Sequence, residues 1–298
     1  MTSTAAAGAG RAAFVDAGSL AEALDTLHEE GPEVTILAGG TDLMVQYIRG
    51  DIHPATFLHV RRLEELKRIV SGATTEIGAV TTHWQIASNA RLRASHPALA
   101  EAAATVGGRQ TQNVGTLAGN VVNASPAADL MPVLLVSDAI VSLNSASGAR
   151  ELPIADFVIG RRATRRKLDE LVTKLSLEPV GARTGEIYLK IGRRGAMEVA
   201  IVGLAARLTF DQSGSVSQAR VAVCSVAPTA LRVPDAEQRL LGSKLDEGTI
   251  IEAGELLRRA ATPIDDSRAT AAYRSRLLAP LLRRAVLECR KRAAGVKV

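Results

Sequence analysis

The sequence predicts an α+β protein with a larger N-terminal part, up to about residue 180, and a smaller C-terminal part. Before residue 180, short β-branched runs such as Val34–Ala38 alternate with stretches of helical periodicity. After it, Glu186–Ile191, Ile201–Phe210 and Val216–Val226 follow one another as strand-like runs. The polar segment 178–185 separates the two patterns. A length of 298 residues fits two domains of about 150 residues each.

The composition is that of an ordinary globular protein, with 47% hydrophobic and 22% charged residues. Aromatic residues make up 3%, which argues against a surface that stacks single-stranded nucleic acid. No apolar run approaches the roughly 18 residues that a transmembrane helix needs, and the first residues lack the apolar stretch of a signal peptide. We therefore expect a cytoplasmic protein without a transmembrane segment or a nucleic-acid partner.

Basic residues exceed acidic ones by 36 to 31, which gives a formal charge of +5. They concentrate in Arg161–Lys167 and near the C-terminus. Solvated helix faces are the favoured interpretation of these clusters, and a phosphate-rich partner is the alternative. Cys224 and Cys289 lie far apart in the sequence, so by themselves they cannot hold an iron–sulfur cluster, which needs a larger set of cysteines.

The first residues, 1–12, are small and featureless and are expected to be disordered. The segment Gly8–Ala13 spells the dinucleotide fingerprint GxGxxA, which we reject because no strand precedes it. Ser19 is expected to cap a helix, and Glu22 stands where it would complete a capping box.

The remaining elements are expected in the following order. The N-terminal part should contain helices at 43–49, 62–68, 82–89 and 97–106, and strands at 57–60, 75–80, 139–143 and 170–177. In the C-terminal part, Gly214 marks a hairpin between two strands, and helices are expected at Asp246–Ala260 and Thr270–Arg292.

The stretch Gly107–Pro132 differs from its surroundings because almost every residue is small or carries an amide. Such a composition is typical of a flexible linker or of a loop that wraps closely around a ligand. Interleaved apolar residues, among them Val114, Leu117 and Val121, favour an ordered loop that binds a ligand.

Two glycine-containing loops have the composition of a phosphate site. The first, Gly39–Asp42, lies between a strand and a helix. Glycine lets backbone N–H groups approach an anion, and the start of a helix adds a favourable dipole. The second loop is Asn113–Asn120. A pyrophosphate has oxygens on several sides, so two such loops indicate it more strongly than one. The P-loop pattern GxxxxGK[ST] does not occur.

Three segments carry a family resemblance: AGGTDLM (Ala38–Met44), TVGGRQTQNVGTLAGNVVNASPAAD (Thr105–Asp129) and YLKIGRRGAMEVAIV (Tyr188–Val202). Together they resemble the FAD-binding medium subunit of the molybdenum hydroxylases, as in carbon monoxide dehydrogenase and xanthine dehydrogenase. SVAPTALR (Ser225–Arg232) and PIDDSRATAAYR (Pro263–Arg274) resemble the C-terminal domain of that subunit. The resemblance covers residues 13–290 in the right order.

The resemblance implies the FAD-binding fold of the vanillyl-alcohol-oxidase (PCMH) type, in which two α/β subdomains hold an extended FAD. It implies an FAD-binding domain at residues 13–182, with a break between its subdomains near residue 60. It also implies a C-terminal sheet-and-helix domain of the carbon monoxide dehydrogenase flavoprotein type at residues 183–292.

The resemblance also implies the contacts to the cofactor. Ala38–Asp42 and Thr116–Asn120 would hold the pyrophosphate, Asp129 would bind FAD hydroxyls, and Tyr188 and Lys190 would lie at the isoalloxazine. The full set of expected FAD-binding residues is Leu37, Ala38, Gly39, Gly40, Thr41, Asp42, Leu43, Met44, Val106, Gly107, Gly115, Thr116, Leu117, Ala118, Gly119, Asn120, Ser125, Asp129, Val172, Tyr188 and Lys190.

Some of these residues have other interpretations. Asp129 is also compatible with a cap of a helix running to Val136, and Lys190 with a solvated charge on a strand. Ala118 departs from the family, which usually has glycine there; its methyl group is tolerable if the residue keeps a negative φ.

The implied function is electron transfer, with no catalytic residue and no metal site on this chain. Substrate would be oxidised at a molybdopterin cofactor on a large partner subunit. Electrons would pass through [2Fe–2S] clusters on a small partner subunit to FAD on this chain, and then to an external acceptor. A dimer of heterotrimers is the expected assembly. The related hydroxybenzoyl-CoA reductase subunit carries an additional cysteine-ligated cluster, and the two cysteines of this chain count against it.

Two other functions stay open at this point. One is a self-contained FAD-dependent reductase of the enolpyruvyl-UDP-glucosamine reductase type, which shares the flavin fold. The other is a non-enzymatic interaction module that depends on the arginine clusters. Purification of the protein would distinguish the three functions. A flavin-yellow chain with a cluster-bearing partner would indicate the electron-transfer subunit, a yellow chain alone the self-contained reductase, and a colourless chain the interaction module.

Overall fold

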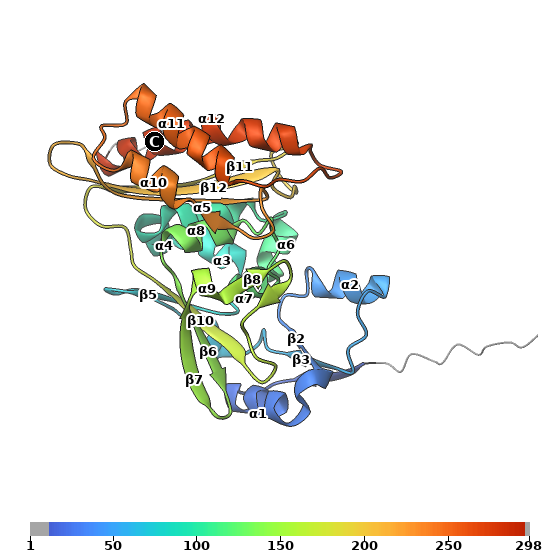
Figure 1. Ribbon diagram of the computed structural model, residues 1–298. Helices are drawn as coiled ribbons and strands as arrows, with labels where there is room; N and C mark the ends of the chain where they lie inside the picture. The colour runs from blue at the N-terminus through green and yellow to red at the C-terminus, as the bar shows by residue number, and fades with distance from the viewer. Residues whose placement is uncertain (1–11, 296–298) are drawn as a thin grey trace, which may run out of the picture.

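The computed structural model describes residues 12–295, so the predictions for 1–12 and for Gly8–Ala13 fall almost wholly outside the described residues. Three main sheets build the molecule (Figure 1). The C-terminal sheet lies at the top of that view, and the other two lie below it. Within residues 12–295, no helix is long and apolar enough to cross a membrane.

The first lobe is a parallel three-stranded sheet in the order β1-β3-β2, with two α-helices. The hydroxyl of Ser19 accepts a hydrogen bond from the backbone N of Glu22 at 3.1 Å, so the expected helix cap is present. The Glu22 carboxylate accepts from the backbone N of Gly18, not of Ser19, at 2.7 Å. The elements of the lobe are β1 (Ala13–Asp16), α1 (Leu20–Glu30), a 3-10 helix (Gly31–Glu33), β2 (Val34–Leu37), α2 (Leu43–Arg49) and β3 (Thr56–His59).

The second lobe is an antiparallel sheet in the order β4-β5-β10-β6-β7, with its helices between this sheet and the C-terminal one (Figure 1). Its strands are β4 (Ile69–Val70), β5 (Thr75–Gly78), β6 (Ile140–Ser145), β7 (Gly148–Pro153) and β10 (Leu171–Leu177), with a separate hairpin of β8 (Val158–Gly160) and β9 (Ala163–Thr164). Its helices are α3 (His83–Ser88), α4 (Ala90–Ser95), α5 (Pro97–Thr105), α6 (Arg109–Val114), α7 (Leu117–Val122), α8 (Leu130–Val136) and α9 (Ile154–Phe157).

The helix predicted at 62–68 is wrong. The structure has a 3-10 helix at Glu64–Leu66, followed by β4. Leu63 and Leu66 are both buried in the core of the first lobe. A single 3-10 turn already places two residues at this spacing on one side, so the apolar pattern does not require a longer helix.

The stretch Gly107–Pro132, predicted as a ligand-binding loop, contains two short helices, α6 and α7, and the start of α8. Thr116 begins α7 by accepting a hydrogen bond from the backbone N of Gly119 at 3.1 Å. Leu117 and Val121 are fully buried in the core of the second lobe. The stretch is therefore an ordered segment, because its scattered apolar residues anchor its helical turns.

The third lobe is an antiparallel four-stranded sheet in the order β11-β12-β13-β14. One face contacts α5 and α8 of the second lobe; α12 packs against β11 and β12, α10 packs against β13, and α11 packs on α10 and α12 (Figure 1). Its elements are β11 (Thr184–Ile191), β12 (Val202–Phe210), β13 (Val216–Cys224), β14 (Leu231–Arg232), α10 (Pro234–Leu240), α11 (Glu247–Ala260) and α12 (Ala271–Ala293).

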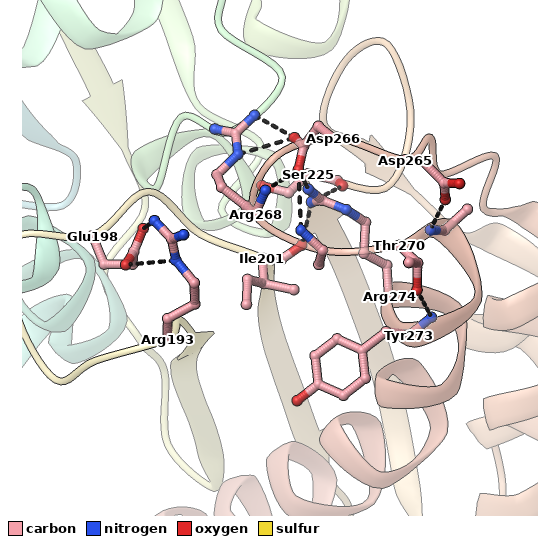
Figure 2. Close-up of polar contacts among 12 residues, drawn as sticks. Arg193, Glu198, Ile201, Ser225, Asp265, Asp266, Arg268, Thr270, Tyr273 and Arg274 are labelled. Atoms are coloured by element: carbon pink, nitrogen blue, oxygen red, sulfur yellow. Dashed lines mark hydrogen bonds and ion pairs between the residues drawn. The ribbon is translucent and has the colours of Figure 1, made fainter.

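A buried arginine organises the connection between α11 and α12. Arg274 is 2% exposed and donates to the carbonyls of Ile201 and Ser225 at 2.6 and 2.9 Å. Figure 2 shows its guanidinium between these carbonyls and Asp266, to which it also donates at 2.8 Å. A hydrogen bond from Arg268 is the largest influence that lowers the pKa of Asp266. The PIDDSRATAAYR segment thus fastens the ends of β12 and β13.

Candidate functional site

A cavity of about 530 Å³ lies between the first and second lobes. Residues of both glycine loops line it, together with apolar side chains from both lobes, such as Ile36, Val60 and Leu171. A cavity of this size is within the range of small-molecule and cofactor sites. The loops that the sequence singled out for phosphate binding therefore face one space.

The first glycine loop, Gly39–Asp42, lies with Ala38 between the end of β2 and the start of α2. A Cβ atom at Gly39 would lie 2.0 Å from the backbone oxygen of Val114, so the two loops touch through their main chains at this point. Gly40 has a φ of +68°, which an L-amino acid adopts at a cost. Glycine is needed at the first position for close approach and at the second for backbone conformation.

The second glycine loop, Asn113–Asn120, is fixed mainly by backbone hydrogen bonds. The backbone N atoms of Leu117 and Ala118 donate to the carbonyls of Thr81 and Ala79 at 2.9 and 3.0 Å. The backbone N of His83 donates to the carbonyl of Gly115 at 3.0 Å. Ala118 lies in α7 and does not have a positive φ, so the backbone condition for tolerating its methyl group is met.

The structure brings part of the expected cofactor-binding set to the cavity and leaves part of it outside. The expected residues that line the cavity are Ala38, Gly39, Gly40, Thr41, Asp42, Leu43, Val106, Gly115, Thr116, Ala118, Gly119, Asn120 and Val172. The expected residues that do not line it are Leu37, Met44, Gly107, Leu117, Ser125, Asp129, Tyr188 and Lys190. Leu37 and Met44 lie beneath Gly40, within 3.2 Å of where its Cβ would be.

Asp129, Tyr188 and Lys190 form a separate buried cluster between the second and third lobes. Tyr188 donates its hydroxyl to Oδ1 of Asp129 at 2.6 Å, and Lys190 donates from Nζ to Oδ2 at 2.8 Å. Lys190 also donates to the carbonyl of Thr105 at 2.9 Å, next to the cavity-lining Val106. The cluster therefore joins β11 to the chain that forms one wall of the cavity.

The electrostatics of this cluster are dominated by burial. Burial raises the pKa of Asp129, while the charge of Lys190 and the two side-chain hydrogen bonds lower it. Burial also raises the pKa of Tyr188 well above its usual value. Asp129 makes no capping hydrogen bond to α8, and Lys190 has a side chain that is 10% exposed. The alternatives of a helix cap and a solvated lysine are therefore wrong.

Sequence analysis named no individual role for several cavity residues, among them Gln46, His83, Asn123 and Arg166. Burial lowers the pKa of His83 to about 4, so its imidazole is neutral at pH 7. Arg166 belongs to the cluster Arg161–Lys167, which was interpreted as a solvated helix face. That interpretation is wrong, because these residues lie on and after the β8–β9 hairpin. Arg166 also donates to the carbonyl of Glu170 at 2.7 Å.

Two buried polar atoms on the cavity wall lack a hydrogen-bond partner among the described residues. They are Nδ1 of His83 and Oδ1 of Asn120. A buried polar group without a partner costs about 1–3 kcal/mol, so such atoms at a cavity indicate a ligand that completes them. Together with the glycine loops and the apolar walls, they fit a ligand with both a polar phosphate part and flat apolar rings, as FAD has.

Comparison with known proteins decides the family. Residues 10–178 match the FAD binding domain in molybdopterin dehydrogenase, and residues 187–289 match the CO dehydrogenase flavoprotein C-terminal domain. The chain belongs to this family. It is an oxidoreductase subunit, and FAD is its cofactor. The second match favours the family's subunit over a self-contained reductase, because it extends through the third lobe.

Similar proteins cover nearly the whole chain. The glyceraldehyde dehydrogenase medium chain of Sulfolobus acidocaldarius is 31% identical over 92% of this chain and 97% of its own length. The xanthine dehydrogenase FAD-binding subunit of Escherichia coli O157:H7 is 29% identical over 95% and 98%. A solved structure of reconstituted CO dehydrogenase from Oligotropha carboxidovorans superposes with a TM-score of 0.91 at 27% identity, covering 95% of this chain and 99% of that one.

Proposed function

We propose that this chain carries FAD as an electron relay in a heterotrimeric molybdenum hydroxylase. In this proposal a small partner subunit with [2Fe–2S] clusters delivers electrons to the FAD, and an external acceptor removes them. A large partner subunit holds the molybdopterin cofactor and oxidises the substrate. Two heterotrimers form the complete assembly. Family membership and the relatives named as medium chains and FAD-binding subunits support this division of labour.

The observation that carries the proposal is the cavity lined by the two glycine loops. Two buried polar atoms of its lining residues have no hydrogen-bond partner among the described residues. In the proposed complex, backbone N–H groups of Ala38–Asp42 and Thr116–Asn120 bind the pyrophosphate. The apolar walls exclude water from the rings. FAD supplies the capacity to accept and release electrons, and this chain holds it in a fixed position.

Residues 13–182 form the cofactor-binding part in this proposal, and residues 183–292 close it from the side of the third lobe. Lys190 connects these two parts, since it bonds both Asp129 and the carbonyl of Thr105. A cation near the flavin favours its reduced, negatively charged form. Lys190 would favour the reduced flavin from its place on the carbonyl of Thr105, next to the cavity-lining Val106.

Anaerobic spectrophotometry tests the relay. The full chain should carry one FAD, which acid precipitation releases into solution because the attachment is non-covalent. Dithionite should bleach the flavin. Purines, other N-heterocycles, aldehydes and carbon monoxide should leave its spectrum unchanged until the cluster and molybdenum subunits are added. Bleaching of the lone chain by such a substrate would replace the relay with a self-contained flavoenzyme.

A further inference from the structure

The first glycine loop continues into α2, a helix with little to hold it in place. None of the residues of α2 is buried, and Val45 and Ile48 are 42% and 80% exposed. Tyr47 packs edge-on against Phe57, which belongs to the same lobe. Figure 1 shows α2 standing apart from α7 and β8 of the second lobe. A separate contact must therefore hold this wall of the cavity at its rim.

Arg162 makes that contact. It donates from Nη1 and Nη2 to the two carboxylate oxygens of Asp42 at 2.7 and 3.3 Å. The same guanidinium bonds the side-chain oxygen of Asn123, which follows α7. Asp42 and Asn123 line the cavity from opposite lobes. One side chain thus bridges the end of the first glycine loop and the end of α7.

The backbone places Arg162 for this role. The residue lies in the turn between β8 and β9 with a φ of +59°, and its backbone N donates to the carbonyl of Ala124 at 3.0 Å. Ala124 itself has a φ of +45°. Left-handed conformations at residues other than glycine cost roughly 1 kcal/mol each and persist where the surroundings require them. The turn is thus fixed on the segment just after Asn123.

We propose that Arg162 is a clasp, a positioning residue that holds the first glycine loop to the second lobe and slows the release of the bound dinucleotide. The inference rests on the proposed function, since it takes FAD as the occupant of the cavity. The arginine also neutralises Asp42, whose carboxylate would otherwise face a diphosphate. The two roles predict opposite results for Asp42→Asn. If Arg162 holds the wall, the variant releases FAD faster; if Arg162 only neutralises the carboxylate, the variant releases FAD more slowly.

The size of the effect follows from the geometry. The side chains of Arg162 and Asp42 are 46% and 44% exposed, and an isolated pair at such a site contributes little. The bond to Asn123 and the two-pronged contact to Asp42 make this a network instead of an isolated pair. Loss of the clasp should accelerate FAD release by roughly 10-fold, a modest figure for a charged hydrogen-bond network.

The experiment measures the rate of FAD release from the full chain after dilution, followed by the fluorescence of free flavin. Arg162→Met and Asp42→Asn should each accelerate release. The double variant should be no faster than the faster single variant, because both changes remove the same contact. Arg162→Lys should release FAD at a rate between those of the wild type and Arg162→Met, since an ammonium keeps the charge but cannot bond both carboxylate oxygens in parallel. High salt should accelerate release from the wild type and leave Arg162→Met unaffected.

Arg161→Met is the matched control, because Arg161 is exposed and has no hydrogen-bond or ion-pair partner among the described residues. It should release FAD at the wild-type rate. An unchanged rate in Arg162→Met would overturn the clasp, and slower release from Asp42→Asn would show that charge neutralisation alone matters. Unfolding of each apoprotein by urea checks that the variants fold. A wild-type chain that binds no FAD would refute the proposed function itself, which is a separate outcome.

Discussion

The two walls of the cavity are built in different ways. The second glycine loop is tied to the second lobe by backbone hydrogen bonds at Leu117 and Ala118, and the side chain of Leu117 is fully buried. The first loop leads into α2, which buries no residue, and it meets the second loop through the close approach of Gly39 to Val114. The site thus pairs a rigid wall with one that depends on a few contacts at the cavity itself.

This difference predicts where mutations act. Changes in the rigid wall should reduce the stability of the whole protein, because its contacts are also contacts of the core. Changes in the first loop should affect cofactor binding more than the free energy of unfolding.

Gly39→Val should abolish FAD binding. A Cβ at this position would lie 2.0 Å from the backbone oxygen of Val114, so the two walls must separate. In the proposed complex, separation withdraws several N–H donors from the pyrophosphate, each of which contributes roughly 1.5–3 kcal/mol as a charge-assisted hydrogen bond. FAD titration by fluorescence measures the loss.

Gly195→Ala is the matched control, since nothing lies within 4 Å of the Cβ that it would add and the residue has no positive φ. It should bind FAD like the wild type. Full occupancy of Gly39→Val by FAD would show that the approach of the two loops is not needed for the site.

Lys190→Met should destabilise the rigid wall. Lys190 and Asp129 have side chains that are 10% and 8% exposed, and removal of one partner leaves a buried carboxylate without its counter-charge. We expect a loss of about 3 kcal/mol in the free energy of unfolding, together with a lower flavin reduction potential. Urea denaturation and potentiometry measure the two effects.

Asp129→Asn in the Lys190→Met background should recover part of this stability, because the buried carboxylate is then absent. If Lys190→Met unfolds at the same urea concentration as the wild type, the cluster is not a structural support of this wall.

Two buried histidines, His83 and His96, should make the free energy of unfolding depend on pH. Burial is the largest cause that lowers the pKa of both His83 and His96 to about 4. Unfolding restores a pKa near 6.5, so the unfolded state takes up protons first. Stability is therefore full above pH 6.5 and is lost as the pH falls towards 4, by about 2 kcal/mol per histidine between pH 7 and 5.

His83→Gln and His96→Gln should each reduce this pH dependence, as measured by urea denaturation across the range. His83 lines the cavity, whereas His96 does not. His83→Gln should therefore also change the affinity for FAD, and His96→Gln should leave it unchanged. Equal effects of both variants on FAD affinity would contradict the placement of His83 at the site.

Much of the fold was predictable because local patterns determine it. The strands at Val34–Leu37, Leu171–Leu177 and Val202–Phe210 follow short β-branched or apolar runs, and the cap at Ser19 follows from residue type. The glycine loops were predictable for a similar reason, since close approach and a positive φ demand glycine at particular positions. Ala118 also meets the backbone condition set for it, and its tolerance in FAD binding stays a prediction.

The rest depends on contacts between distant residues. The sequence does not show that Arg162 turns back towards Asp42, 120 positions earlier, or that Arg166 is partly buried at the cavity. Short elements such as β8 and β9 are too brief to show a periodicity. His83 has no local signal, and for Asn123 the amide-rich stretch Gly107–Pro132 shows a ligand-binding segment but not the contact to Arg162.

The smallest predicted effect compares one threonine from each wall. Thr116 accepts a hydrogen bond from the backbone N of Gly119 and begins α7, so Thr116→Ala should lower the free energy of unfolding by about 1 kcal/mol. Thr41 is exposed and makes no side-chain hydrogen bond among the described residues. Thr41→Ala should therefore leave the apoprotein's stability within about 0.5 kcal/mol of wild type. It should still weaken FAD binding, because Thr41 lines the cavity and belongs to the loop proposed to bind the pyrophosphate. Urea denaturation of the apoproteins and FAD titration separate the two effects. If Thr41→Ala destabilises the apoprotein as much as Thr116→Ala does, the two walls are equally fixed, and the distinction drawn between them is wrong.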